Sequence, residues 1–202
     1  IKIKTSKDKT EENNLGKANN TKSTKYKLDY GPSLTQNELS DIPLIHDYGF
    51  SGQNVLVGIM DAGFAWQGHS ALNSRTVIAE RDFVNGDENT DDGDASHGTA
   101  VFSLIGGFAE GNIIGPAYSA QFAIAKTEYI YTETHTEEDN YAAALEWMDS
   151  LGVDITTTSL GYSTFDKGEG DYAYSDMDGK TTIVTKASEI AFSKGILTVT
   201  SA

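Results

Sequence analysis

Residues 55–63 read VLVGIMDAG, and this stretch decides the fold. Six apolar residues in a row, 55–60, are typical of a strand in a parallel sheet that is covered on both faces. Asp61 follows at once, and Gly63 comes two residues later. An aspartate at the carboxyl end of such a strand lies where open α/β sheets place their ligands. Aspartate and glycine are also common turn residues, so a plain turn is an equal alternative at this point.

The remaining chain alternates between strand-like and helix-like segments. Further strands are expected at residues 76–78, 121–126, 154–158 and 196–200. Helices are expected at residues 33–48 (interrupted at Pro43), 137–151 and 181–194, and in the segment that begins near His97. This alternation predicts an α/β fold: a doubly wound, mostly parallel sheet with helices on both faces.

Residues 94–107, DASHGTAVFSLIGG, place a histidine between an acidic loop and a nearly all-apolar segment of helical length. A helix that is apolar on every side is a buried helix, so His97 is expected at the start of a core helix, with Ser96 as N-cap. A neutral imidazole held rigidly there has what a general base near neutral pH requires. The alternative is a histidine that only caps the helix.

Two strands bring chemically useful residues to the same expected edge of the sheet. Asp61 ends one strand. A run of three follows another: Ser159, Leu160 and Gly161. Helix N-termini face this edge too, so His97 is expected beside Asp61. A carboxylate that orients an imidazole and stabilises its cation makes up two-thirds of a nucleophilic triad.

Composition excludes several classes of protein. Residues 1–27 carry 8 lysines and 3 acids and few apolar residues, which predicts a flexible basic leader or linker. The other 175 residues carry 7 basic and 27 acidic side chains, which argues against a nucleic-acid partner. The chain has no cysteine, hence no thiol nucleophile or disulfide, and it lacks a run of about 18 apolar residues that could span a membrane. It starts with Ile1 and shows no signal peptide, so a processed precursor or a fragment is expected.

Two polar loops could have functional roles. Residues 87–94, DENTDDGD, hold five carboxylates, which could suit calcium, but the spacing fails the EF-hand pattern and a solvated acidic loop is favoured. Residues 162–179 form a long connection with several aromatic side chains, which could contact a substrate or only pack the loop onto the body.

Four blocks resemble the subtilisin-like serine proteases (subtilases). Residues 57–63 resemble the segment around that family's catalytic aspartate, and His69 stands where such proteins often carry a second, non-catalytic histidine. Residues 97–101, HGTAV, resemble the catalytic histidine motif. Residues 159–161 resemble the substrate-binding strand, and residues 195–202 the strand that leads to the oxyanion-hole asparagine.

The order and spacing of the blocks agree with this resemblance, which covers roughly residues 30–202. His97 follows Asp61 by 36 residues and precedes Ser159 by 62 residues. The resemblance implies that residues 28–202 are the N-terminal part of a subtilisin-like peptidase domain. The fold would then stop before the last strands and the nucleophile helix.

The resemblance also implies roles for individual residues. Asp61 would orient His97, and His97 would act as general base and then as general acid. Ser159, Leu160 and Gly161 would hold the substrate backbone as an added strand. Ala62 departs from the family pattern, because a hydroxyl residue usually follows the aspartate and supplies a local hydrogen bond.

The family's nucleophile is missing from the sequence. Its Gly-Thr-Ser segment is absent, and the expected Gly-Asn would follow directly after Ala202. The expected partners are therefore a C-terminal remainder of the same domain and a polypeptide substrate. No cofactor is required for the chemistry, although structural calcium is possible. The strong acidity together with the resemblance suggests a secreted, periplasmic or cell-surface protein.

Two alternative functions remain. The first is a catalytically inactive subtilase-like domain that only binds peptides along residues 159–161. The second is a hydrolytic metal site formed by Asp61, His69 and His97, which requires all three donors to reach one ion at about 2 Å.

Overall fold

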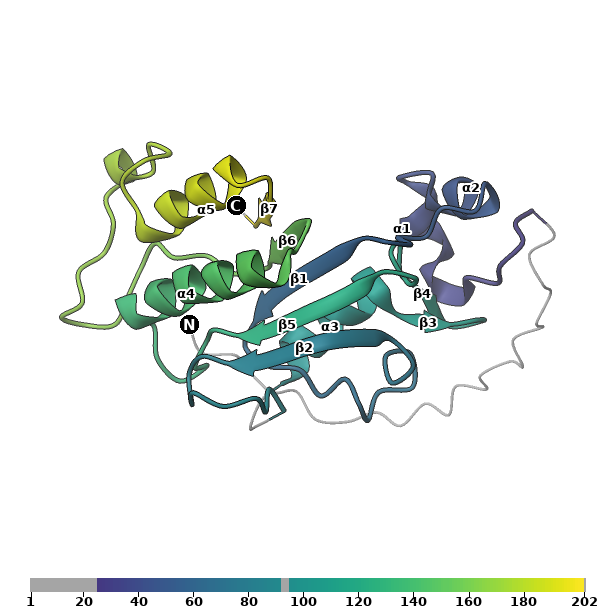
Figure 1. Cartoon of the computed structure of the whole chain (residues 1–202), viewed down its shortest axis with the longest axis horizontal. Coiled ribbons are helices and arrows are strands. Elements are labelled where there is room, and N and C mark those ends of the chain that lie inside the picture. Colours follow the sequence, from purple (N-terminus) through teal and green to yellow (C-terminus); the bar gives the residue numbers. More distant parts are fainter. Residues whose placement is uncertain (1–24, 92–94, 202) are drawn as a thin grey trace, which may run out of the picture.

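The computed structural model describes residues 25–91 and 95–201. Its centre is a sheet of five parallel strands in the order β2-β5-β1-β6-β7 (Figure 1). The strands are Leu56–Asp61 (β1), Thr76–Asp82 (β2), Gln121–Lys126 (β5), Ile155–Thr158 (β6) and Leu197–Thr200 (β7). The predicted parallel sheet is confirmed, and β1, which contains all of the apolar run except Val55, is its middle strand.

Helices cover both faces of the sheet, as the sequence predicted. α3 (Ser96–Gly106) lies on one face, and α4 (His135–Leu151) and α5 (Ile183–Ser193) lie on the other (Figure 1). α4 begins two residues before the expected start at 137. Thr134 and Glu137 form a capping box there, which satisfies N–H groups of the first helical turn.

β1 packs against both helical layers because its side chains alternate between the two faces. Met60 belongs to the apolar core on the α4 side, whereas Val57 and Ile59 belong to the core on the α3 side. Gly58 faces α4, and a Cβ atom at this position would lie 2.5 Å from Sδ of Met148. The glycine therefore lets α4 approach the central strand closely.

Shorter elements surround the sheet. The single interrupted helix expected over residues 33–48 is instead two helices. Pro43 lies in the first turn of the second helix, where a missing N–H is tolerated. These elements are a 3-10 turn (Gly31–Ser33), α1 (Leu34–Glu38), α2 (Ile42–Asp47), β3 (Phe108–Ala109), β4 (Ile113–Ile114) and a second 3-10 turn (Tyr174–Asp176).

Most of the predicted basic leader, residues 1–24, lies outside the described residues. Its last residues contact the body of the protein. Lys25 Nζ is 2.9 Å from Glu38 Oε1, and the backbone N–H of Lys27 donates to Asp47 Oδ1 at 3.0 Å. Within the described ranges, no helix has the length and apolarity needed to cross a membrane.

The prediction that α3 is buried on every side is wrong. Phe102 is fully buried against the sheet, whereas Leu104 on the same helix is 50% exposed. The expected N-cap is also displaced by one residue, because the helix begins at Ser96 and Ala95 occupies the N-cap position. α3 therefore has one buried face and one outer face that carries an apolar side chain.

The two faces of α3 predict unequal effects of truncation. Phe102→Ala should lower the free energy of unfolding by about 3–5 kcal/mol, because it empties a fully buried site. Leu104→Ala, the matched control on the outer face, should lower it by less than about 1 kcal/mol. Chemical denaturation measures both values, and equal losses would contradict the orientation of the helix.

Candidate active site

Asp61 is the last residue of β1, and its side chain is completely buried. Its Oδ1 atom accepts two hydrogen bonds, each of 2.7 Å: one from the backbone N–H of Ala62 and one from the imidazole Nδ1 of His97. Burial raises the pKa of the Asp61 carboxyl above its ordinary value, and these two hydrogen bonds oppose that rise. The site thus holds a carboxylate away from water and directs it at an imidazole.

His97 is the second residue of α3, and its side chain is 55% exposed. Because Nδ1 donates to the carboxylate, the neutral ring carries its proton on Nδ1 and has a lone pair on Nε2. No hydrogen bond to Nε2 occurs among the described residues. The Nε2 atom of His97 is therefore available as a base on the solvent side of the ring, while the buried Asp61 carboxylate holds Nδ1.

Two glycines allow the close approach of α3 to the end of β1. A Cβ atom on Gly98 would lie 2.2 Å from the carbonyl oxygen of Gly63 and 2.9 Å from Cβ of Asp61. Gly63 itself has a φ of +142°, a conformation that side chains disfavour. Glycine at both positions is therefore required for His97 to reach Asp61.

Thr99 also holds this junction, and the sequence reasoning did not single it out. Its Oγ1 accepts a 2.8 Å hydrogen bond from the backbone N–H of Ala65 and donates a 2.6 Å bond to the carbonyl of Ala95. It thereby ties the first turn of α3 to the loop after β1. The only signal in the sequence was its place in the HGTAV block.

The departure at Ala62 has a structural counterpart. The second carboxylate oxygen of Asp61, Oδ2, is buried and has no hydrogen-bond partner in the described parts of the chain. A methyl side chain at position 62 supplies no donor. Unpaired buried acceptors are costly, which agrees with the raised pKa of Asp61.

The predicted substrate strand follows β6 directly. The backbone N–H and Oγ of Ser201 donate to the carbonyls of Thr158 and Leu160, both at 2.9 Å. Since these two carbonyls are two residues apart and face β7, the backbone groups of Ser159 and Gly161 face the opposite way. Both of these residues are exposed, and nothing lies within 4 Å of a Cβ built on Gly161.

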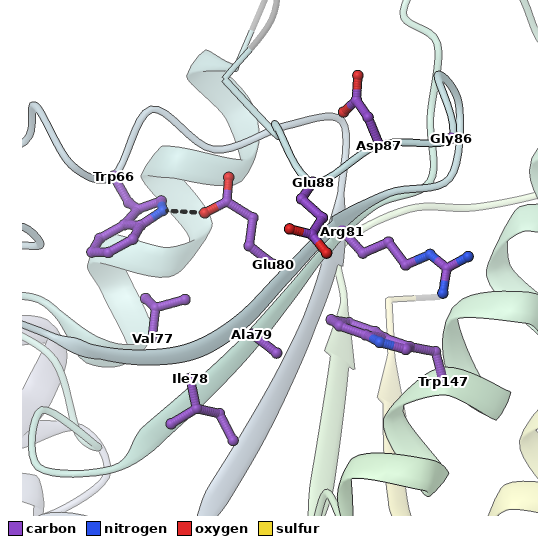
Figure 2. Close-up of a pocket in the computed structure, with 10 residues that line it drawn as sticks. All are labelled: Trp66, Val77, Ile78, Ala79, Glu80, Arg81, Gly86, Asp87, Glu88 and Trp147. Carbon is purple, nitrogen blue, oxygen red and sulfur yellow. Dashed lines mark hydrogen bonds between the residues drawn. The ribbon is translucent and has the colours of Figure 1, made fainter.

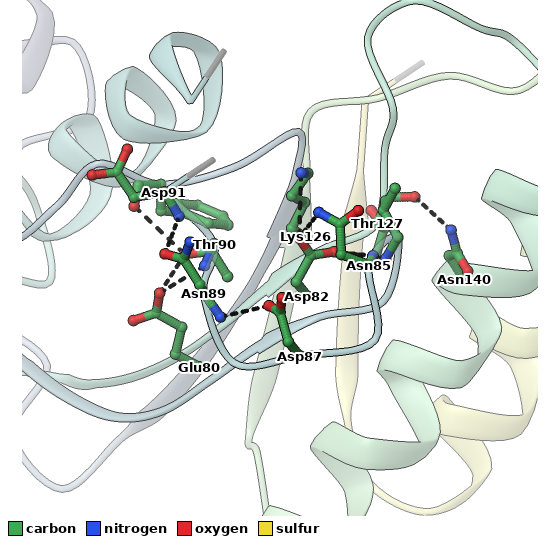
Figure 3. Close-up of polar contacts among 12 residues, drawn as sticks. Glu80, Asp82, Asn85, Asp87, Asn89, Thr90, Asp91, Lys126, Thr127 and Asn140 are labelled. Carbon is green, nitrogen blue, oxygen red and sulfur yellow. Dashed lines mark hydrogen bonds and ion pairs between the residues drawn. The ribbon is translucent and has the colours of Figure 1, made fainter. Parts of the chain in front are cut away.

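The acidic loop is anchored to the sheet at Thr90, so it does not extend into solvent along its whole length. Thr90 is fully buried, its hydroxyl donates to Glu80 Oε1 at 2.7 Å, and its carbonyl accepts a bond from the N–H of Phe64 (Figure 3). Residues 92–94 lie outside the description. Calcium binding by this loop therefore stays a prediction.

A buried ion pair lies next to this loop. Lys126 Nζ is 3.3 Å from Asp82 Oδ2, at the carboxyl ends of β5 and β2 (Figure 3). The main-chain N–H groups of Val84 and Asn85 also donate to Asp82 Oδ1. These bonds satisfy the buried carboxylate and fix the turn that leaves β2.

A pocket of about 680 Å³ lies at the free edge of β2 and away from the candidate site. Trp66 and Trp147 stand on its two sides, and Trp66 Nε1 donates to Glu80 at 2.9 Å (Figure 2). None of Asp61, His97 or residues 159–161 lines it. Its size therefore does not identify the site of chemistry.

The alternative metal site lacks support in the described residues. No three histidine or acidic side chains there are grouped so that they could hold an ion. His69, the third donor of that hypothesis, has a buried Nδ1 without a hydrogen-bond partner in the same ranges. Among the described residues, no third side chain joins Asp61 and His97 in a metal site.

The fold and the pair define a class: doubly wound α/β proteins with a buried carboxylate and an imidazole joined at the carboxyl edge of a parallel sheet. A family model described as the subtilase family matches residues 52–202. The chain therefore belongs to the subtilase family, and the resemblance seen in its sequence is confirmed.

Curated relatives agree with this assignment. Subtilisin E of Bacillus subtilis (strain 168) is 29% identical over 124 residues, which cover 60% of this chain and 31% of the relative. Subtilisin of Bacillus pumilus is 29% identical over 123 residues, which cover 60% of this chain and 42% of the relative. The chain thus spans about a third to two fifths of the length of these relatives.

Solved structures share the fold. MycP3 protease from the type VII (ESX-3) secretion system superposes with a TM-score of 0.63 at 19% identity, covering 85% of this chain and 46% of that one. Fervidolysin from Fervidobacterium pennivorans, a keratinolytic enzyme related to subtilisin, gives a TM-score of 0.55 at 22% identity, covering 75% and 22%. At these identities the likeness concerns the fold alone.

The glycine contact predicts a steric effect on the pair. Gly98→Ala should lower the free energy of unfolding by about 1–3 kcal/mol and weaken the His97–Asp61 hydrogen bond, because the methyl group pushes α3 away from Gly63. Denaturation and the nitrogen NMR shifts of the His97 ring measure the two effects. Gly68→Ala, with nothing within 4 Å, is the matched control and should change neither.

The hydrogen bond to His97 predicts a change in the titration of Asp61. His97→Ala removes a bond that lowers the pKa of this carboxyl and leaves the burial that raises it, so the pKa should rise further. Carboxyl carbon NMR shifts followed against pH measure it. A fall in the pKa, or an equal rise in His69→Ala, would contradict the assigned pairing.

Proposed function

We propose that this chain provides the aspartate, the histidine and the substrate-binding strand of a serine endopeptidase. The observation that carries the proposal is the 2.7 Å hydrogen bond between the buried carboxylate of Asp61 and the half-exposed imidazole of His97. The nucleophilic serine and the oxyanion asparagine would come from a segment C-terminal to residue 202. Membership of the subtilase family supports this reading.

The geometry of the pair suits general base catalysis. Asp61 holds the tautomer with the proton on Nδ1, so Nε2 of His97 can take the proton of a serine hydroxyl as its oxygen attacks the peptide carbonyl. His97 would then give this proton to the leaving amine nitrogen. The buried carboxylate would stabilise the imidazolium that forms between these two transfers, without itself taking the proton.

Residues 159–161 are proposed to bind the substrate backbone. The exposed backbone groups of Ser159 and Gly161 face away from β7 and could pair with an extended peptide. Leu160 would stay tied to Ser201 and keep the strand in place. The substrate class is therefore an extended polypeptide.

The exposed apolar surface near β7 supports a C-terminal partner segment. Leu197 and Val199 on this edge strand are about half exposed. An edge strand with apolar side chains in water invites pairing with a further strand. We expect the C-terminal remainder of the domain to pair with β7 and to cover these side chains.

The remaining properties follow from the same proposal. The chemistry assigned to Asp61 and His97 needs no cofactor, and structural calcium in the acidic loop is a separate expectation. The protein is expected to act outside the cytoplasm, as a secreted, periplasmic or cell-surface enzyme. Its partners would be the polypeptide substrate and the C-terminal segment, with no nucleic acid.

Reconstitution with the C-terminal segment tests this proposal. Together, the two pieces should react with a serine-directed fluorophosphonate and cleave peptides. His97→Ala and Asp61→Asn should each lower kcat on the order of 10⁴- to 10⁶-fold, because the base is lost or misoriented. His69→Ala is the matched control and should keep activity.

The opposite results point to the alternative function. If both pieces fold together and no labelling occurs, catalysis by this pair is excluded. Peptide binding that survives His97→Ala would then identify an inactive peptide-binding domain.

A further inference from the structure

A buried hydrogen bond links Glu128 to Tyr162, two residues far apart in the sequence. The Tyr162 hydroxyl donates to Glu128 Oε1 at 2.6 Å, and the hydroxyl of Thr127 donates to the same oxygen at 3.1 Å. Both Glu128 and Tyr162 are less than a tenth exposed. A carboxylate and a phenol are expensive to bury, so their pairing in this place calls for a physical reason.

Their position relates the bond to peptide binding. β1 lies between β5 and β6 in the sheet (Figure 1), and its neighbours end at Lys126 and Thr158, in register with the last two residues of β1. Glu128 therefore lies just past the end of β5. Tyr162 directly follows Gly161, the last residue of the proposed substrate strand. The bond joins the chain segments that continue the two neighbours of β1.

The surroundings of Glu128 are acidic. Burial raises the pKa of its carboxyl to about 7, and Glu137 of α4 and Glu133 in the preceding loop add to the rise. The hydrogen bonds from Tyr162 and Thr127 act in the opposite direction. Glu128 thus changes its charge near neutral pH.

We propose that Glu128 is a positioning residue for peptide binding: through its hydrogen bond with the Tyr162 hydroxyl it holds the backbone at Gly161. This inference rests on the proposed function of residues 159–161. It assigns Glu128 no contact with the substrate and no part in the chemistry at His97.

The direction of the pH effect follows from linkage. Because the Tyr162 bond lowers the pKa of Glu128, the bond is stronger to the ionised carboxylate than to the neutral acid. The strand at residues 159–161 is therefore held more firmly above about pH 7.

The same raised pKa of Glu128 has the opposite effect on global stability. The folded state loses stability relative to the unfolded chain as pH rises from 4.5, the ordinary pKa of a glutamate, through about 7.

Steady-state kinetics on the reconstituted enzyme test the proposal between pH 5.5 and 9. In the wild type, KM for a peptide should fall as pH rises through about 7, by about three- to tenfold. Glu128→Gln keeps an acceptor for Tyr162 but cannot ionise, so its KM should lose this pH dependence. Tyr162→Phe should raise KM above pH 7 and leave kcat within about twofold.

A matched control removes a hydroxyl from a different buried carboxylate. Tyr172 donates to both oxygens of Glu138, which also pairs with His135. Tyr172→Phe should leave KM and its pH dependence unchanged, because this cluster does not hold residues 159–161. If KM in Glu128→Gln and Tyr162→Phe follows the wild-type pH profile while catalysis is intact, the inference is overturned and the proposed function stands.

Amide hydrogen exchange separates a failure of the inference from a failure of the proposed function. If reconstitution yields no catalysis, the proposed function fails. The positioning role of Glu128 is then tested by amide exchange at residues 160–162 of this chain. Exchange that slows above about pH 7, after correction for intrinsic rates, and that quickens in Tyr162→Phe supports the positioning role. Protection that is equal in the wild type and in both variants overturns it.

Discussion

The close contact between the first turn of α3 and the end of β1 is the constraint on which the site depends. Gly98 lies against the carbonyl of Gly63 and against Asp61, in a space where a single methyl group would collide. This contact brings the Nδ1 atom of His97 to 2.7 Å from a carboxylate that water does not reach. The core on the α3 side holds the helix at that distance, so packing and chemistry share the same few residues.

Several acidic side chains are buried at the carboxyl edge of the sheet, and each has a different set of hydrogen-bond or ion-pair partners. Asp61 has an imidazole and one backbone N–H, and one of its oxygens has no partner in the described residues. Asp82 pairs with Lys126 and caps a turn. Glu128 accepts hydrogen bonds from two hydroxyl groups, and burial raises the pKa of its carboxyl to about 7. Burial therefore produces an orienting group, a structural anchor and a titrating group at one edge.

The sequence predicted more of the sheet than of the helices. The unbroken apolar run of β1 favours a central parallel strand, because such a strand is covered on both faces. The apolar segment after His97 predicts a fully buried helix, and this prediction is wrong because a sequence does not show how much of a helix its neighbours cover. Pro43 predicts an interruption, but it lies in the first turn of α2. Proline breaks a helix from an interior position and is tolerated in the first turn, and the sequence alone does not show which position it occupies.

By itself the sequence determined the family, the parallel α/β architecture and the identity of Asp61, His97 and residues 159–161 as the residues of interest. These follow from local patterns and motif order, which need no distances. Only the tertiary structure decided that His97 reaches Asp61 and that Glu128 bonds to Tyr162. It also decided that, among the described residues, an oxygen of the Asp61 carboxylate has no donor beside Ala62. The His97–Asp61 and Glu128–Tyr162 contacts join residues more than thirty positions apart. Their geometry depends on how the strands and helices pack, which no local pattern encodes.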